Sequence, residues 1–207
     1  MLIYIDGIDG CGKSVLCQHL KEYLPNSIVI PLLNGGPIGT AVRHHYLLNP
    51  APNSNDTFYA MATMVANIET LYDVVLPAKQ VGKNVIVDRS LGSYWAYQVM
   101  MGKFRNEFAL DLFNKVTRAA KFQLVKPDLY IQCEVDIAVA NERLSNRETN
   151  SIDLLDVHVK EQLIKGYEQF YNIANSVFEW PVERLDCNAD LSIVKTKLIK
   201  LVDRRRK

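Results

Sequence analysis

Gly7 to Ser14 are the residues whose types and spacing most directly suggest chemistry, because they read Gly-Ile-Asp-Gly-Cys-Gly-Lys-Ser and match the pattern G-x-x-x-x-G-K-S. This pattern is typical of a loop that binds the phosphates of a nucleoside triphosphate. Its glycines let backbone N–H groups approach phosphate oxygens with no Cβ in the way. Lys13 can bring a positive charge to the β- and γ-phosphates, and the Ser14 hydroxyl can bind Mg²⁺. The residues that we expect to contact the nucleotide are Gly7, Asp9, Gly10, Cys11, Gly12, Lys13, Ser14 and Val15.

The sequence on either side of this loop fits the same interpretation. An apolar run, Leu2–Ile5, precedes the loop, and an amphipathic pattern over residues 13–24 follows it and stops at Pro25. A strand, a glycine-rich loop and then a helix are the context that the motif requires, and the helix N-terminus favours an anion. An ordinary glycine turn is the alternative, and this context argues against it.

A second cluster, Asp88-Arg89-Ser90, directly follows the apolar run Asn84–Val87. In a chain with a phosphate-binding loop, an acid at the end of a buried strand indicates a Mg²⁺ ligand, so we expect Asp88 to act with Ser14. Arg89 can form two hydrogen bonds to a phosphate. The alternative is an exposed Asp–Arg pair at a strand end, and the loop upstream favours the functional interpretation.

A third cluster contains Arg143 and Arg147, four residues apart on a predicted helix face, followed by the polar segment Ser145–Asp153. Such a segment could form a short lid, here about residues 143–154, whose arginines neutralise charge on a transferred phosphoryl group. The alternative is a solvated helix face with Glu142 and Glu148 as ion-pair partners.

Further candidates lie in and after the first loop. A carboxylate inside a phosphate-binding loop would repel phosphate, so Asp9 could organise Mg²⁺ or an arginine, contact an acceptor's sugar, or simply favour a turn. Arg43, after the glycine-rich stretch 34–39, could hold a second phosphate or lie on a surface helix. Phe58 or Tyr59 could stack on a base. The apolar stripe that begins at Phe58 on the predicted helix 55–81 could also belong to the core or to a subunit interface.

The composition is that of an ordinary globular protein. The chain has 207 residues, of which 48% are hydrophobic and 23% charged, with a net charge of +1. This balance supports neither a general nucleic-acid partner nor a membrane surface, and one domain over residues 1–207 is expected. Four cysteines without metal or disulfide spacing, and no signal peptide, predict free thiols and a cytoplasmic location.

Short apolar runs alternate with helical patterns along the chain, which predicts an α/β fold: a five-stranded parallel sheet flanked by helices. The expected strands are Leu2–Ile5, Ser27–Leu32, Asn84–Val87, Asp128–Cys133 and Val182–Leu185. The expected helices cover residues 13–24, 38–48, 55–81, 91–101, 106–121, 136–147, 154–178 and 190–205. The carboxyl ends of parallel strands meet at one edge, where ligands bind, so the first loop and Asp88-Arg89 should lie together.

Over essentially its whole length the chain resembles the thymidylate kinase family of P-loop nucleoside monophosphate kinases. The most specific part runs from Val75-Leu76-Pro77-Ala78 through Gly82-Lys83 and a strand to Asp88-Arg89, then Ser93-x-x-Ala96-Tyr97-Gln98. Phe58-Tyr59-Ala60 and the lid arginines occur in the family's order. The resemblance implies a P-loop kinase fold and phosphorylation of dTMP to dTDP, with ATP and Mg²⁺, by a homodimer.

The resemblance also implies roles for individual residues. Asp9, Lys13, Arg89, Arg143 and Arg147 would form the catalytic set. Lys13 and Ser14 would hold the donor phosphates and Mg²⁺, and Asp88 would also bind the Mg²⁺. The lid arginines would close on ATP. The residues implied to bind the acceptor nucleotide are Asp9, Arg43, Phe58, Arg89, Ser93, Tyr97 and Gln98. Among these, Phe58 would stack on the pyrimidine and Tyr97 would lie against the deoxyribose.

Some positions depart from the family pattern. Ala62 stands where the family usually has a base-reading arginine, Asn34 where an acid is frequent, and Ser90 where an aromatic residue is common. Thr63 or Asn67 could instead read a different or modified base. Two further alternatives stay open: a deoxynucleoside kinase, which needs no clamp for an acceptor phosphate, and a regulatory nucleotide-binding module, although Lys13 and Asp88 are both retained.

Overall fold

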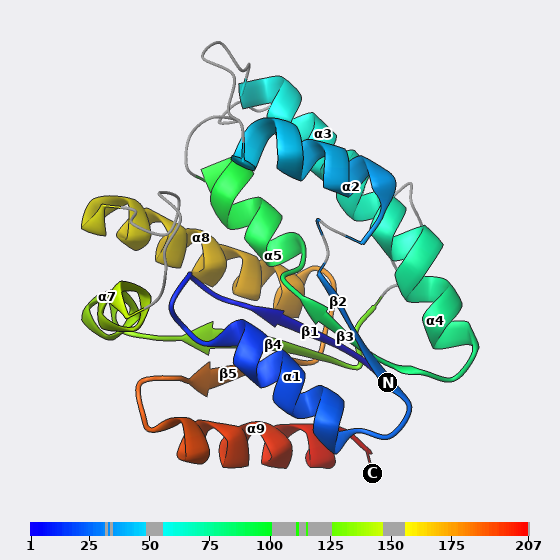
Figure 1. Ribbon diagram of the computed structural model, residues 1–207, viewed down its shortest axis with the longest axis vertical. Helices are drawn as coiled ribbons and strands as arrows, with labels where there is room; N and C mark the ends of the chain where they lie inside the picture. Colours follow the sequence, from blue (N-terminus) through cyan, green and yellow to red (C-terminus); the bar gives the residue numbers. More distant parts are fainter. Residues whose placement is uncertain are drawn as a thin grey trace.

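A five-stranded parallel sheet forms the centre of the protein (Figure 1). The structure is a computed structural model that describes residues 1–31, 33, 35–48, 56–100, 111, 115, 126–146 and 156–206. The strands are β1 (Leu2–Asp6), β2 (Ser27–Pro31), β3 (Asn84–Asp88), β4 (Leu129–Glu134) and β5 (Val182–Asp186), in the order β2-β3-β1-β4-β5. All neighbouring pairs are parallel, which confirms the predicted fold class.

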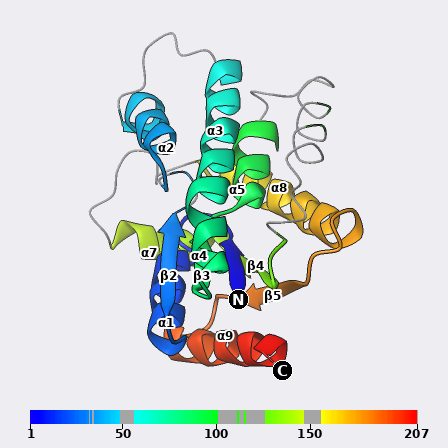
Figure 2. The ribbon, with the colours of Figure 1, turned by 90° about the vertical axis from the view of Figure 1, so that its right-hand side faces the viewer.

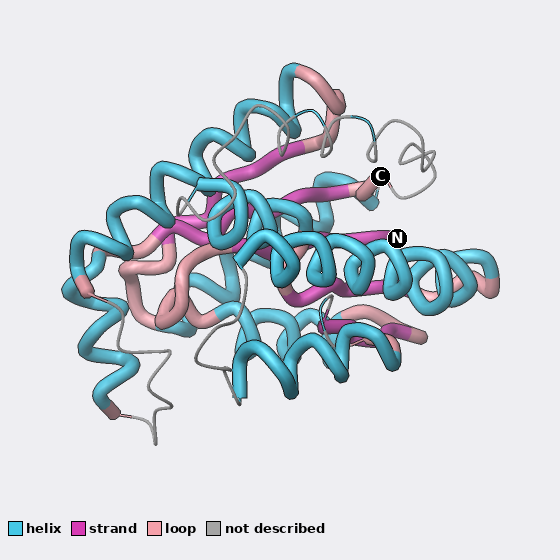
Figure 3. Tube along the Cα trace, turned by 90° about the horizontal axis from the view of Figure 1, so that it is seen from above, coloured by secondary structure: helices cyan, strands magenta, loops and turns pink. Residues whose placement is uncertain are grey.

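Helices cover both faces of the sheet, so its central strands are mostly apolar, as buried parallel strands usually are (Figure 3). On one face lie α1 (Lys13–Tyr23) and α9 (Leu191–Arg206), and on the other α5 (Leu91–Tyr94) and α8 (Val157–Ser176) (Figure 1). Successive residues of β1 point to opposite faces. Ile3 and Ile5 accordingly pack with side chains of α1 and α9, whereas Leu2 and Tyr4 pack with those of α5 and α8.

Helices α2 (Pro37–Val42) and α3 (Asp56–Thr70), which follow β2, lie beyond the carboxyl ends of the strands (Figure 2). Helix α4 (Leu76–Gln80) then leads into β3, and α7 (Ile137–Ser145) follows β4. Three predicted helices contain a π-helical turn, at Arg43–Leu48, Leu71–Val75 and Trp95–Met100. The predicted helix 106–121 lies outside the described residues, apart from helical residues at 111 and 115.

The four cysteines, Cys11, Cys17, Cys133 and Cys187, are buried and free, as predicted. Within the described parts of the chain, no helix combines the length and apolar character needed to cross a membrane.

Candidate active site

The loop from Gly7 to Gly12 joins β1 to α1 and has the backbone that its glycines permit. Gly10 and Gly12 adopt φ values of 87° and 95°, in the left-handed region that favours glycine. A Cβ on Gly10 would also lie 2.5 Å from the carbonyl oxygen of Ala140, in α7. Gly10 is therefore required both by its own conformation and by the close approach of the helix that leads into the predicted lid.

Lys13 is the first residue of α1, and its ammonium group lies inside the loop. Its Nζ donates to the carbonyl oxygens of Gly7 and Ile8, at 2.8 Å each, and lies 3.8 Å from Asp9 Oδ1. The side chain is only 6% exposed, so the positive charge is concentrated within the loop rather than dispersed in solvent. This is the position that the motif predicts for a phosphate-binding lysine.

Asp88 meets the start of α1 because β1 and β3 are neighbours in the sheet. The Ser14 hydroxyl donates to Asp88 Oδ2 at 3.0 Å. The other oxygen, Asp88 Oδ1, is buried and has no hydrogen-bond partner. Mg²⁺ in kinases is commonly held by one or two protein oxygens together with substrate phosphates, so a hydroxyl beside an unsatisfied carboxylate oxygen fits such an ion.

Asp9 organises an arginine, which is one of the three roles considered for it. Arg89 Nη2 forms an ion pair with Asp9 Oδ1, and the Tyr97 hydroxyl donates to Asp9 Oδ2 at 2.7 Å. The Arg89 guanidinium also lies 5.5 Å from the centre of the Tyr97 ring. Residues of the first loop, of the end of β3 and of the segment after α5 thus form one polar cluster.

The charges in this cluster determine the ionisation of Asp9. Burial by itself would raise the pKa of the carboxyl group, but the positive charges of Arg89 and Lys13 and the hydrogen bond from Tyr97 outweigh it. The pKa of Asp9 consequently lies well below its usual range. Asp9 is therefore ionised at neutral pH and partly offsets the two positive charges beside it.

These residues enclose a small polar cavity of about 100 Å³ at the carboxyl edge of the sheet. Its lining comes from the loop, the end of β3 and α7, and consists of Asp9, Gly10, Gly12, Lys13, Ser14, Asp88, Arg89 and Leu144. The two clusters that the sequence placed at strand ends are thus brought together.

Comparison with known proteins agrees with this geometry. The family model described as Thymidylate kinase matches residues 5–186. The chain is 30% identical to a thymidylate kinase of Synechococcus sp. (strain CC9605), over 81% of this chain and 82% of the relative. The identity to a thymidylate kinase of Parasynechococcus marenigrum (strain WH8102) is 31%, over 83% of each chain. For one from Aster yellows witches'-broom phytoplasma it is 29%, again over 83% of each chain.

The chain belongs to the thymidylate kinase family. It is therefore a phosphotransferase, and the resemblance that the segment from Val75 to Gln98 indicates is confirmed.

Other residues expected from the thymidylate kinase resemblance surround the cluster less closely. Arg43 is exposed, and Phe58 is 63% exposed at the start of α3. Burial chiefly raises the pKa of the Tyr59 phenol, while its interactions with Arg43, Arg89 and Gln98 act in the opposite direction.

The remaining expected residues are in the lid and in α5. The guanidinium of Arg143 donates to the Ala189 carbonyl oxygen at 3.4 Å, across α7 and the loop after β5. Ser93 is buried and contacts Asp6 and Tyr167, so a role of Ser93 in binding substrate stays a prediction. Arg147, Asp153 and most of the predicted lid lie outside the described residues.

Sequence reasoning missed Asp6, although a signal for it was present. Asp6 follows the apolar run Leu2–Ile5 just as Asp88 follows Asn84–Val87, and the same argument applies to both.

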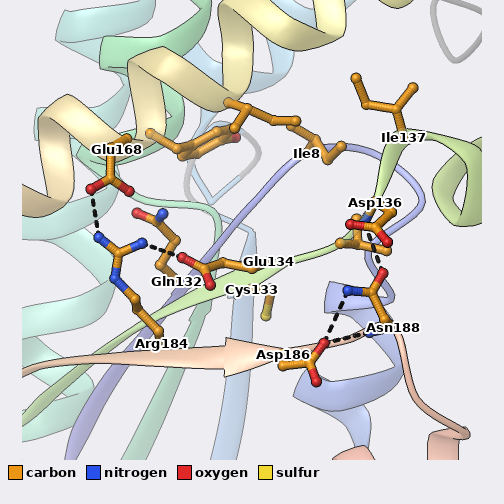
Figure 4. Close-up of a pocket in the computed structure, with 13 residues that line it drawn as sticks. Ile8, Gln132, Cys133, Glu134, Asp136, Ile137, Glu168, Arg184, Asp186 and Asn188 are labelled. Carbon is orange, nitrogen blue, oxygen red and sulfur yellow. Dashed lines mark hydrogen bonds and ion pairs between the residues drawn. The ribbon is translucent and has the colours of Figure 1, made fainter.

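A larger cavity, of about 700 Å³, lies between α7, α8 and the ends of β4 and β5 (Figure 4). In it, Arg184 forms ion pairs with both Glu134 and Glu168, and Asn188 donates to Asp186 at 3.0 and 3.1 Å. Arg184 thus pairs with two of the four carboxylates that line the cavity, and the cavity touches the phosphate-binding loop only through Ile8 among its lining residues.

Proposed function

We propose that this protein transfers the γ-phosphoryl group of ATP to dTMP and forms dTDP. Family membership supports the reaction class and the acceptor. The observation that carries the proposal at the level of residues is the ion pair between Asp9 and Arg89, which holds an arginine beside the donor-binding loop at the position where an acceptor phosphate would meet it.

On the donor side, the loop Gly7–Gly12 would bind the ATP phosphates through backbone N–H groups, with Lys13 supplying a positive charge. Ser14 and Asp88 would hold Mg²⁺, a proposal supported by their 3.0 Å contact and by the unsatisfied Asp88 Oδ1. When bound, Mg²⁺ would neutralise charge on the β- and γ-phosphates. The Lys13 ammonium would exchange its two carbonyl partners for phosphate oxygens.

On the acceptor side, Arg89 would bind the phosphate of dTMP, with Arg43 as a second cation. Tyr97 would lie against the deoxyribose and Phe58 would stack on the base, with Ser93 and Gln98 as further contacts. The exposure of Phe58 supports this role, because a ring that is 63% exposed can be covered by a ligand. Catalysis would then rest mostly on positioning and on charge stabilisation, to which Arg143 and Arg147 contribute from the lid.

Recognition of the base would use contacts other than the usual arginine, because Ala62 occupies that position. The next polar side chains on α3 are Thr63 and Asn67, both buried, and they are the candidates for hydrogen bonds to the pyrimidine. Ala62→Arg should change the ratio of kcat/KM for dTMP to that for dCMP by about tenfold or more, the scale of one hydrogen-bonding contact to the base, because thymine and cytosine present different hydrogen-bonding groups. An unchanged ratio would show that position 62 does not take part in reading the base.

A homodimer would fit the apolar surface of α2 and α3. Ile38, Met61 and Val65 are 40% to 50% exposed, and Met61 and Val65 share a face of α3. We further propose that residues 1–207 act as one domain. Analytical ultracentrifugation of the wild type and of Val65→Lys tests the dimer: the wild type should sediment as a dimer and the variant should dissociate. A monomeric wild type would refute it.

The experiment that tests the function is a coupled ADP-release assay with Mg-ATP and a panel of acceptors: dTMP, dUMP, TMP with ribose, and thymidine. We expect fast turnover with dTMP and slow ATP hydrolysis without an acceptor. Turnover with thymidine alone would identify a nucleoside kinase instead. Turnover with none of the acceptors would favour a nucleotide-binding module.

A further inference from the structure

Asp6 lies at the end of β1, and the proposed reaction assigns no role to its carboxylate. It is completely buried. Its Oδ1 accepts hydrogen bonds from the Ser90 N–H at 2.9 Å and from the Ser93 hydroxyl at 2.6 Å, and its Oδ2 accepts one from the Ser90 hydroxyl. No cation in the described part of the chain pairs with it. A buried carboxylate held only by hydrogen bonds is costly, so its presence in the core needs a structural reason.

The residue next to Ser90 is Arg89, and its backbone is unfavourable. Arg89 has φ = 70°, in the left-handed region, which costs an L-residue with a side chain about 1–2 kcal/mol. Such a conformation persists only where the surroundings determine it strongly. Interactions on both sides of Arg89 are therefore needed to hold it.

The last two residues of β1 supply these interactions. On one side, the Arg89 N–H donates to the Ile5 carbonyl oxygen at 2.9 Å. On the other side, Asp6 holds Ser90 through both its backbone N–H and its hydroxyl. Ser90 is also the N-cap of α5, where its side chain accepts from the Gly92 N–H. The conformation of Arg89 is thus fixed between two adjacent residues of one strand.

We infer that Asp6 is a positioning residue for the acceptor phosphate: it holds Ser90, and thereby the left-handed backbone that aims the Arg89 guanidinium at Asp9 and the small polar cavity. This inference rests on the proposed role of Arg89 in binding dTMP. Asp6 contacts no substrate in this account and acts only through Arg89. The donor site is built from the loop, α1 and Asp88, and none of the hydrogen bonds described for the Asp6 carboxylate goes to these residues.

Gly92, at the start of α5, is consistent with this role of Asp6. A Cβ at Gly92 would lie 2.6 Å from Asp6 Oδ2 and 2.6 Å from the Tyr130 hydroxyl. Only glycine therefore lets the start of α5 come close enough for Ser90 to reach both oxygens of Asp6.

The test is a double-mutant cycle between Asp6→Asn and Arg89→Ala, with dissociation constants for dTMP and for ATP measured by calorimetry on the full-length protein. Asp6→Asn keeps the shape of the side chain but replaces one acceptor oxygen by a donor that faces the N–H or hydroxyl donors of α5. We expect it to weaken dTMP binding about tenfold, the scale of a lost hydrogen bond to a charged group, and to change ATP binding less than about twofold. In the Arg89→Ala background, Asp6→Asn should cause no further change in the dissociation constant for dTMP.

The control is Asp128→Asn, the same substitution at the opposite end of β1, where the Asp128 carboxylate accepts from the Leu2 N–H at 2.6 Å. It should lower stability without changing dTMP affinity. If Asp6→Asn does not fold, Ser90→Ala replaces it in the cycle, because it removes the hydroxyl bonds to Asp6 and to the Gly92 N–H but keeps the Ser90 N–H bond to Asp6.

Two outcomes would overturn the inference, and they differ from failure of the proposed function. If Asp6→Asn weakens dTMP binding equally with and without Arg89, Asp6 does not act through that residue. If it weakens ATP and dTMP alike, its role is general stability. If Arg89→Ala alone leaves dTMP affinity unchanged, the clamp itself is wrong and the inference fails with it.

Discussion

Replacing Asp9 by asparagine removes the negative charge that Arg89, Lys13 and Tyr97 share. The Arg89 ion pair and the 2.7 Å hydrogen bond from Tyr97 both become weaker, and two cations at the same cavity lose their common partner. A hydrogen bond to a charged group is worth about 1.5–3 kcal/mol, and losing the partner of a fully buried charge costs about 3–5 kcal/mol.

The expected loss of stability on Asp9→Asn is smaller than the sum of these two energies. Arg89 is 33% exposed and Asp9 18%, so solvent screens their interaction, and the amide oxygen of asparagine can still accept one hydrogen bond. We therefore expect Asp9→Asn to lower the free energy of unfolding by about 2 kcal/mol at pH 7, or the Tm by about 4–8 °C. Urea unfolding followed by circular dichroism measures it. Asp73→Asn, an exposed position on a π-helical turn, is the control and should change stability by less than about 0.5 kcal/mol.

The pH dependence of this difference follows from the depressed pKa of Asp9. A carboxyl group of this kind contributes stability that is fully present above its unfolded-state pKa, about 3.9, and is lost as the pH falls through the lower folded-state pKa. The difference between wild type and Asp9→Asn should therefore be equal at pH 7 and pH 5. A difference that is absent at pH 7, or that disappears between pH 7 and pH 5, would refute the assignment of Asp9 as an ionised partner of Arg89.

Three further predictions concern the same edge of the sheet. Lys13→Ala should lower kcat about 100-fold or more in the coupled assay, because a preorganised charge at the transferred phosphate is lost, and near-normal turnover would contradict its role. Asp88→Asn should raise the Mg²⁺ concentration for half-maximal rate by about tenfold, within the range seen when a metal-binding group is lost, and an unchanged Mg²⁺ titration would exclude Asp88 as a ligand. Gly92→Ala should cost about 1–3 kcal/mol in urea unfolding, because its Cβ would lie 2.6 Å from Asp6 and Tyr130, so wild-type stability would mean that α5 can move.

The local parts of the site could be predicted from the sequence because their signals are contiguous. The phosphate-binding loop needs glycines, a lysine and a hydroxyl at fixed spacing between a strand and a helix, and these groups all lie between Gly7 and Ser14. Asp88-Arg89 could be placed at the same edge because parallel strands bring their carboxyl ends together. The five strands were likewise predicted to within two residues at each end, since buried parallel strands are continuous apolar runs.

The partners of Asp9 and Asp6 could not be predicted in this way. Asp9 had three possible roles in the sequence, and Arg89, 80 residues further on, is selected only because β1 and β3 are neighbours. The π-helical turns within three predicted helices also carry no signal in the apolar periodicity.

The sequence alone determined which chemical groups this protein has and that they stand at strand ends, because loop motifs and apolar periodicity are properties of neighbouring residues. The order β2-β3-β1-β4-β5, by contrast, is a property of the packed sheet. This order places β1 between β3, which ends in Asp88, and β4, which ends in Glu134. As a result, Asp6 accepts a hydrogen bond from Ser90, and Asp9 forms an ion pair with Arg89. Such pairings depend on distances between residues far apart in the chain, and only the tertiary structure decides those distances.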